Sequence, residues 1–405
     1  MKPKSIIISL LFMISNSLHT SGADWPQWRG PDRNNISKET EWTDEWAGGQ
    51  PKEVWRSEVQ LGFGSMVVAD GRLFTMGHDG KETVTLFCLD SETGKRIWKS
   101  SWKSDLGDKY FEGGAVTTPI VNKEHLYVLG RWGKVFCMKA DNGTMNWQRD
   151  LVEEEGVRLP TWGFSGAPVI DGEKILLNVG EAGMALSKST GKTIWKSANR
   201  SAGYSTPVIF ESAGKEWAIF SSGKQYSAVD IATGKPWWSF RWLTRYGVNA
   251  TDPIVTKEGH AFISSGYGKG SAHIKMFKED PEILWKSRDL KNQTCTSLLI
   301  DGYLYGVDGD TTQKASLKCI DLGTGKKRWT YEGFGSGNIL AANGKLICLS
   351  GKGELLVAPV SPNSFKPKAK AQVLEGKCWN PHILANGYLY CRNATGELIC
   401  LDLRK

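Results

Sequence analysis

A nine-residue pattern, Asp-x-x-Thr-Gly-Lys-x-x-Trp, recurs along this chain and limits the folds that are open to it. Full copies begin at Asp90, Asp230 and Asp321. Full and partial copies end at tryptophans spaced 43 to 49 residues apart: Trp98, Trp147, Trp195, Trp238, Trp285 and Trp329. Each full copy follows an apolar run, turns at a glycine and continues into a second strand, so the pattern predicts a β-hairpin.

A second predicted hairpin lies between successive copies, as in residues 167–177, where two apolar strands flank Asp171-Gly172. Eight such stretches occur, and several turn at Asp-Gly or Asn-Gly, which adopt positive φ readily. Two hairpins per repeat give four strands, labelled A to D in chain order. Four-stranded repeats of this period predict an all-β, eight-bladed β-propeller.

The two ends of the chain are expected to close this ring. The last repeat stops after its third strand, around residues 398–403, whereas residues 54–57 precede the first A strand and carry Trp55. Pairing these segments would complete the last blade and remove an exposed sheet edge. The seventh repeat differs, because residues 359–370 contain three prolines and no tryptophan. We expect Val373 or Leu374 to stand where the other repeats place Trp.

The repeated tryptophans are expected to be structural. A blade buries its faces only against its neighbours, so a large flat side chain at each seam, the contact between two blades, supplies packing. We assign this docking role to the equivalent tryptophans: Trp55, Trp98, Trp147, Trp195, Trp238, Trp285 and Trp329.

The N-terminus has the pattern of an export signal. Lys2 and Lys4 precede an apolar run at residues 6–14, and Ser21-Gly22-Ala23 offers small residues for cleavage. The run is too short to span a bilayer, and no later segment is apolar enough. The predicted organisation is a signal peptide (1–23), an N-terminal extension (24–53) and the propeller (54–405), in a periplasmic or secreted protein.

The charge of the chain gives no indication of nucleic-acid binding. Cleavage after Ala23 would remove Lys2 and Lys4, which lowers the formal net charge from +8 to +6. A nucleic-acid partner would require a concentrated basic stripe.

The tryptophan pattern resembles that of the pyrroloquinoline-quinone (PQQ)-type propeller repeats. These repeats occur in quinoprotein alcohol dehydrogenases, in the outer-membrane assembly lipoprotein BamB and in many uncharacterised exported proteins. The opener Asp24-Trp25-Pro26-Gln27-Trp28-Arg29-Gly30-Pro31 resembles one found in short exported members. The chain lacks room for the insertions of the dehydrogenases, so its size favours the BamB-like and short exported branches.

The resemblance implies a specific chemistry for any enzyme of this family. A quinoprotein dehydrogenase holds PQQ and calcium with oxygen ligands, uses an acidic base and stacks the quinone on a disulfide of adjacent cysteines. This sequence has no Cys-Cys pair and no matching ligand motif. We therefore expect no cofactor, no metal site and no catalytic residues, with a PQQ- and calcium-dependent dehydrogenase as the alternative.

The eight cysteines are expected to be buried free thiols. Four of them occupy the same C-strand position in different blades: Cys88, Cys137, Cys319 and Cys400. Equivalent positions in neighbouring blades lie about 10 Å apart, whereas a disulfide needs Cα atoms within about 7 Å.

A ligand site is expected on one face of the ring. The short A–B and C–D turns define the turn face, and the long D–A and B–C connections define the loop face, where function concentrates on rigid scaffolds. Loop-face aromatic and charged residues include Tyr110, Glu112 and Tyr246. The candidate binding residues are Arg131, Trp132, Trp162, Arg245, Asp252, Trp379, Asn380 and Arg392.

These residues favour a binding protein over an enzyme. The leading hypothesis is a non-catalytic exported scaffold that binds protein or peptide at the loop face, since mixed Arg, Trp and Asn suit such ligands. A carbohydrate-binding propeller is the second alternative, after the dehydrogenase.

Overall fold

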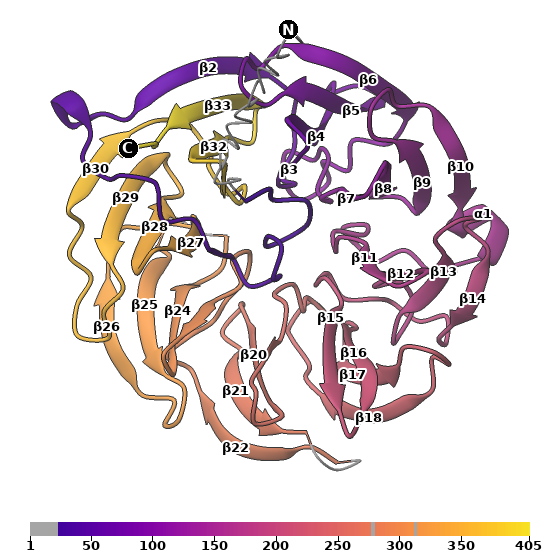
Figure 1. Ribbon diagram of the computed structural model, residues 1–405. Helices are drawn as coiled ribbons and strands as arrows, with labels where there is room; N and C mark the ends of the chain where they lie inside the picture. The colour runs from indigo at the N-terminus through magenta and orange to yellow at the C-terminus, as the bar shows by residue number, and fades with distance from the viewer. Residues whose placement is uncertain (1–22, 277–279, 312–313) are drawn as a thin grey trace, which may run out of the picture.

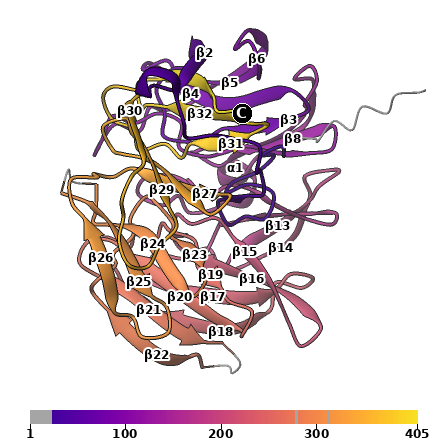
Figure 2. The same cartoon turned by 60° about the vertical axis from the view of Figure 1, so that its left-hand side comes forward.

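The computed structural model describes residues 23–276, 280–311 and 314–405. Eight sheets, each built on four antiparallel strands, follow one another around a central axis (Figure 1). The predicted eight-bladed propeller of four-stranded blades is confirmed. Figure 2 shows the outermost strands, such as those of the first and fourth blades, at the rim of the ring.

The strands of the first four blades lie in chain order from the axis to the rim. Blade 1 consists of β3 (Val67–Ala69), β4 (Arg72–His78), β5 (Thr83–Asp90) and β6 (Arg96–Lys103), and blade 2 of β7 (Ile120–Asn122), β8 (His125–Leu129), β9 (Lys134–Lys139) and β10 (Met145–Asp150). Blade 3 consists of β11 (Val169–Asp171), β12 (Lys174–Leu177), β13 (Met184–Ser187) and β14 (Thr193–Lys196), and blade 4 of β15 (Val208–Ser212), β16 (Lys215–Ser221), β17 (Gln225–Asp230) and β18 (Pro236–Arg241).

The next three blades continue this order, and the eighth takes its outer strand from the N-terminal side. Blade 5 consists of β19 (Ile254–Val255), β20 (His260–Ser265), β21 (Gly270–Lys275) and β22 (Glu282–Ser287), and blade 6 of β23 (Leu298–Ile300), β24 (Tyr303–Asp308), β25 (Ser316–Asp321) and β26 (Lys327–Tyr331). Blade 7 consists of β27 (Asn338–Ala342), β28 (Lys345–Leu349), β29 (Glu354–Pro359) and β30 (Ala369–Gln372), and blade 8 of β31 (Ile383–Ala385), β32 (Tyr388–Arg392), β33 (Glu397–Asp402) and β2 (Lys52–Glu58).

The ring closes as the sequence predicts. Strand β2 pairs antiparallel with β33, and Trp55 lies opposite Cys400. The strand begins at Lys52, two residues before the start expected from the repeat. Cys88, Cys137 and Cys319 also lie opposite seam tryptophans, so the predicted equivalence of these cysteines is confirmed.

At five of the described seams, a tryptophan packs against the glycine turn of the next blade. The Trp55 indole N–H donates to the carbonyl oxygen of Ser91 at 3.0 Å, and its ring lies where a Cβ on Gly94 would stand. Trp147 repeats this contact with Lys188 and Gly191. The glycine of Thr-Gly-Lys is therefore required for close approach of the indole as well as for its positive φ.

The residue at the tryptophan position of blade 7 differs from the prediction. Ala369, opposite Val357, occupies the position that carries Trp in the other blades, rather than Val373 or Leu374. The bulge that precedes the tryptophan elsewhere is absent from the β29–β30 ladder. Trp42 and Trp46, from the N-terminal segment, pack into the hydrophobic cluster that joins blades 7 and 8. This seam is thus filled by aromatic residues from outside the repeat.

The N-terminal segment, residues 24–51, crosses the turn face of the ring (Figure 1). It contains β1 (Ile36–Ser37), which pairs parallel with β27, and the 3-10 turn η1 (Ala47–Gly49). Trp25, which is 2% exposed, pairs with Val68 of blade 1. The segment is therefore packed against the propeller over most of its length. The predicted signal peptide falls almost entirely within residues 1–22, which lie outside the described residues.

All eight cysteines are buried free thiols, as expected. Burial raises the pKa of every one of them, which keeps the thiols protonated and unreactive. The α-helix α1 (Leu151–Glu155) spans a single turn, capped by the Asp150 side chain. Within residues 23–276, 280–311 and 314–405, no helix is long and apolar enough to cross a bilayer.

Candidate functional site

A cavity of about 770 Å³ opens at the centre of the loop face. Residues that precede the A strands of seven blades line it: Phe63, Val116, Ser165, Thr206, Asp252, Thr296 and Trp379. Because these segments enter the ring from different blades, they surround the axis. The cavity is therefore held by the rigid propeller rather than by one mobile loop.

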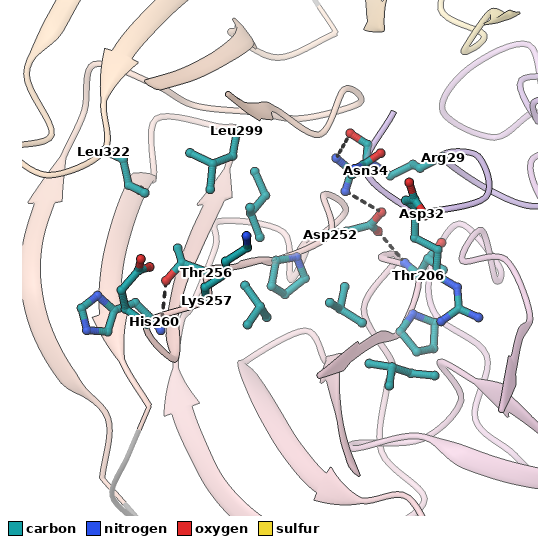
Figure 3. A pocket seen from close by; sticks show the side chains of 18 of the residues that line it. Arg29, Asp32, Asn34, Thr206, Asp252, Thr256, Lys257, His260, Leu299 and Leu322 are labelled. Atoms are coloured by element: carbon teal, nitrogen blue, oxygen red, sulfur yellow. Dashed lines mark hydrogen bonds and ion pairs between the residues drawn. The ribbon is translucent and has the colours of Figure 1, made fainter. Parts of the chain in front are cut away.

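The floor of this cavity comes from the N-terminal segment. Trp28 lies at the axis, and its indole N–H donates to the Asp252 carboxylate at 2.7 Å. The Asp252 carboxylate also accepts from the Thr206 amide at 2.8 Å and lies 3.8 Å from the Arg29 guanidinium (Figure 3). Trp28, Thr206 and Asp252 line cavities on both sides, so they form the partition that closes the central channel.

The charges in this partition are buried. Burial raises the pKa of the Asp252 carboxyl, against the opposing effects of Arg29, the Trp28 indole and the Thr206 amide. Burial likewise lowers the pKa of Arg29, which Asp252 partly offsets. Arg29 also donates to the carbonyl oxygen of Ser297 at 3.0 Å. Asp252 therefore holds the N-terminal segment in the channel through its contacts with Trp28 and Arg29.

Two groups of aromatic rings form the side walls. In the first group, the Trp162 ring lies 5.4 Å from Tyr110 and 5.8 Å from Tyr204, between ring centres. In the second group, the Phe63 ring lies 5.4 Å from Phe111 and 5.7 Å from Trp379. Such rings present broad apolar contact area with little side-chain entropy to lose on binding.

Few charges reach the rim of the cavity. Lys377 bonds to Glu112 and lies 4.4 Å from the centre of the Trp379 ring. Burial tends to raise the pKa of Glu112, but the Lys377 ammonium brings the net pKa below its ordinary value. The cavity therefore combines aromatic walls with polar side chains that could orient a ligand. The uncharged ones are Ser165, Thr206, Gln293, Thr294, Thr296 and Thr311.

Three of the eight sequence-predicted binding residues line this cavity: Trp162, Asp252 and Trp379. Trp132 and Arg245 lie outside its lining. The Trp132 indole donates to the carbonyl oxygen of Asp105, and the exposed Arg245 guanidinium lies 5.3 Å from the Tyr246 ring centre.

The remaining three predicted residues brace the backbone. Arg131 donates to the carbonyl oxygens of Trp162, Leu106, Gly107 and Gly114. Asn380 donates to Gly62 and Gly64, and the fully buried Arg392 donates to Thr75, Met76 and Gln60. Burial lowers the pKa of Arg131 and of Arg392 to about 10. These side chains hold the loops that carry the aromatic walls.

Several residues that line the cavity were not predicted from the sequence: Trp28, Phe63, Phe111, Tyr204, Tyr267 and Lys377. Trp28 had a signal, because it is one of four tryptophans in the short N-terminal extension, with Trp25, Trp42 and Trp46. The others lie in loops of irregular sequence, where no period assigns a direction to a side chain.

The residues present do not fit a calcium-bound quinone. A hard cation needs several carboxylate or amide oxygens around one point. Among the residues that the structure describes, no three His, Cys, Asp or Glu side chains cluster in a way that could hold a metal ion. Asp252, the carboxylate at the axis, already faces a guanidinium and two N–H donors.

A larger cavity, of about 1200 Å³, lies on the turn face beyond the partition. Its walls are the N-terminal segment, the A strands of blades 3 to 6 and residues farther from the axis in blades 5 and 6, among them His260 and Leu322 (Figure 3). The binding mouth was predicted on the loop face alone, so this second cavity differs from the prediction.

Comparisons with known proteins agree with this architecture. The model of the family described as outer membrane protein assembly factor BamB matches residues 81–331. BamB of Moranella endobia is 22% identical over 318 residues, which cover 74% of this chain and 79% of that protein. The crystal structure of BamB from Moraxella catarrhalis superposes with a TM-score of 0.65 at 14% identity, covering 87% of this chain and all of that one.

The fold is also similar to that of an enzyme. Quinohemoprotein alcohol dehydrogenase from Comamonas testosteroni superposes with a TM-score of 0.66 at 13% identity, covering 94% of this chain and 81% of that one. At this identity the similarity shows the propeller fold alone.

Proposed function

This chain belongs to the family described as outer membrane protein assembly factor BamB, and we propose that it is an exported, non-catalytic scaffold that binds a protein segment at its loop face. The observation that carries the proposal is the aromatic-walled cavity of about 770 Å³ at the axis. Its walls come from seven blades, so a bound segment would meet a preformed surface and little ordering would be required.

The electrostatics of the cavity support binding rather than catalysis. Asp252 accepts hydrogen bonds from Trp28 and Thr206 and faces Arg29, and Glu112 is bonded to Lys377. Two of the three carboxylates that line the cavity are therefore engaged by partners within the chain, and the third, Asp108, is exposed. We propose that the protein works without PQQ or calcium.

Crosslinking from inside the cavity tests this function. Tyr110, 57% exposed, lines the cavity, and Tyr246, 51% exposed, is a matched tyrosine outside its lining. A photoreactive phenylalanine at position 110 should crosslink an exported or outer-membrane protein in cells. The same label at position 246 should not, and Trp162→Ala with Trp379→Ala should reduce the product at least about tenfold. Equal products at both positions, or no effect of the two substitutions, would contradict the proposal.

Carbohydrate binding is the second candidate, because the Tyr110 ring next to Trp162 could stack on a sugar. Retention of the purified protein on a polysaccharide column, lost in Trp162→Ala, would favour this candidate. No retention, together with a protein crosslink at position 110, would favour the scaffold.

A further inference from the structure

The N-terminal segment shows how the inner edges of the blades bind an extended chain. Trp25 and Val68 of β3 exchange two backbone hydrogen bonds, each of 2.9 Å. The next residue, Pro26, accepts from the amide of Val121 in β7 at 2.8 Å. The A strands of blades 1 and 2 therefore use their inner edges as pairing surfaces for a peptide.

Blade 7 binds the same segment in the opposite orientation. β1 pairs parallel with β27, with Ile36 opposite Ala341, and the Ala341 amide donates to the carbonyl oxygen of Asn35 at 3.0 Å. The bridge between Trp25 and Val68 is antiparallel. The inner edge of an A strand thus accepts an added strand in either direction.

Five blades lack an added strand or backbone bridge from the N-terminal segment. Within the described residues, their inner end strands are β11, β15, β19, β23 and β31. Arg33 of that segment donates to the carbonyl oxygen of Ile170 in β11. Glu39 accepts from the amides of Asn386 and Gly387 after β31. The inner edges of β15, β19 and β23 therefore remain. An uncovered strand edge presents unpaired N–H and C=O groups and is a template for another chain. Proteins that bind peptides by strand addition use such edges.

The uncovered edges carry the same sequence as a covered one. The run Thr118-Pro119-Ile120-Val121 leads into blade 2, and Thr206-Pro207-Val208-Ile209 leads into blade 4. Blade 5 repeats it as Asp252-Pro253-Ile254-Val255. Ile209 and Val255 are therefore the counterparts of Val121, whose amide bonds to Pro26.

The exposure of these counterparts differs as strand addition requires. Val68, Val121 and Ala341, which the N-terminal segment covers, are 0%, 7% and 3% exposed. Ile209, Val255 and Leu299 are only half-buried. All three line the turn-face cavity, whose volume of about 1200 Å³ is larger than a typical small-molecule pocket. Figure 3 shows Leu299 on the side of this cavity opposite Arg29 and Thr206.

We propose that the inner edges of β15, β19 and β23 bind an extended peptide of another protein by strand addition. The peptide would carry apolar residues at alternate positions, which cover Ile209, Val255 and Leu299. It would complete on blades 4 to 6 the cover that the N-terminal segment supplies on blades 1, 2 and 7. This site lies across the Trp28 partition from the loop-face cavity and is independent of it.

Selected peptides test the proposal. A displayed library of random heptapeptides is panned against the protein, and the strongest binders are synthesised with a fluorescent label for anisotropy titration. We expect binders with alternating apolar residues. N-methylation of alternate amides in one register should weaken binding at least about tenfold, whereas methylation in the other register should have a smaller effect, because successive amides of a strand point to opposite sides.

Matched variants locate the site. Ile209→Lys, Val255→Lys and Leu299→Lys, combined, should weaken peptide binding at least about tenfold. The control triple, Ile97→Lys, Ile194→Lys and Ile283→Lys on outer strands, should bind as the parent does. Trp162→Ala with Trp379→Ala should also leave peptide binding unchanged, which separates this site from the loop-face cavity.

Hydrogen exchange on the parent protein tests the same site even if the lysine variant misfolds. Bound peptide should slow hydrogen exchange at the amides of residues 208–210 and 254–255, and not at those of the outer strand β18. Failure to select any peptide, equal binding to the lysine triple, or unchanged exchange at these amides would overturn the proposal.

Discussion

His382 is buried between blades 7 and 8, where its Nε2 lies 3.0 Å from the carbonyl oxygen of Ile347. Burial lowers its pKa from 6.5 to about 4, because the imidazolium form would lose its hydration. Between these two values the unfolded chain binds a proton that the folded chain does not. Stability is therefore complete above about pH 6.5 and decreases as the pH falls towards 4.

We predict that His382→Gln weakens this dependence. Glutamine retains an N–H donor for Ile347 and cannot titrate, so the slope of stability between pH 4 and 6.5 should decrease by up to about 1.4 kcal/mol per pH unit. His273, whose pKa burial also lowers to about 4, should retain part of the slope. Urea denaturation at several pH values measures this effect, and equal slopes for parent and variant would contradict the assignment.

Trp28 joins the N-terminal segment to the propeller through its indole N–H and the Asp252 carboxylate. Trp28→Phe keeps an aromatic ring at the axis and removes this donor. We predict a loss of about 2 kcal/mol in the free energy of unfolding, because the hydrogen bond is to an acidic group. In the control Trp132→Phe, the lost acceptor is the carbonyl of Asp105, and we expect about 1 kcal/mol. Equal losses of unfolding free energy in the two variants, measured by urea denaturation, would show that the hydrogen bond to the Asp252 carboxylate is no stronger than one to a backbone carbonyl.

At the scale of elements, the seam between blades 7 and 8 shows how a missing repeat residue is replaced. Strand β30 offers Ala369 where other D strands carry Trp. The N-terminal segment supplies Trp42, 3% exposed, and Trp46 to the same cluster. The extension is therefore part of the core of the propeller, although it lies outside the repeats.

We predict that Trp42→Ala destabilises the protein by about 3–5 kcal/mol, the cost of truncating a buried tryptophan. Hydrogen exchange should accelerate in β28–β30 and β31–β33, on the two sides of this seam. Trp98→Ala, at the seam of blades 1 and 2, is the matched control and should accelerate exchange there instead. Acceleration in the same strands for both variants would show that the seams do not open separately.

At the scale of the whole molecule, stability depends on closure of the ring. Strand β33 pairs with β32 of its own blade and with β2 from the other end of the chain. Deleting residues 396–405 should therefore expose two strand edges and a hydrophobic seam. We predict a decrease in Tm of at least about 5 °C. Deletion of Lys405 alone, an exposed residue, is the control. A truncated protein that melts within about 2 °C of the parent would contradict the closure model.

The sequence alone determined the repeating part of this protein. Strand order, blade number, ring closure and the burial of all eight cysteines follow from apolar runs, turn residues and a regular spacing of tryptophans. These signals are local, and each recurs several times, so that errors in one copy are corrected by the others. Asp252 and Trp379 were predicted at the mouth because they stand just before A strands, a fixed position in that repeat, whereas Trp162 was predicted there because it lies in a long loop-face connection.

The positions of the non-repeating residues follow only from the folded structure. Trp28 bonds to Asp252, which is 224 residues away, and Arg29 reaches Ser297 at a separation of 268 residues. No period relates such residues, and the same side chains could have faced solvent. Arg131, Asn380 and Arg392 were predicted at the mouth, yet their donors satisfy backbone carbonyls, because a buried carbonyl without a partner is costly. The competition among distant polar groups for partners is a property of the folded ring, so it becomes visible only when the blades are assembled.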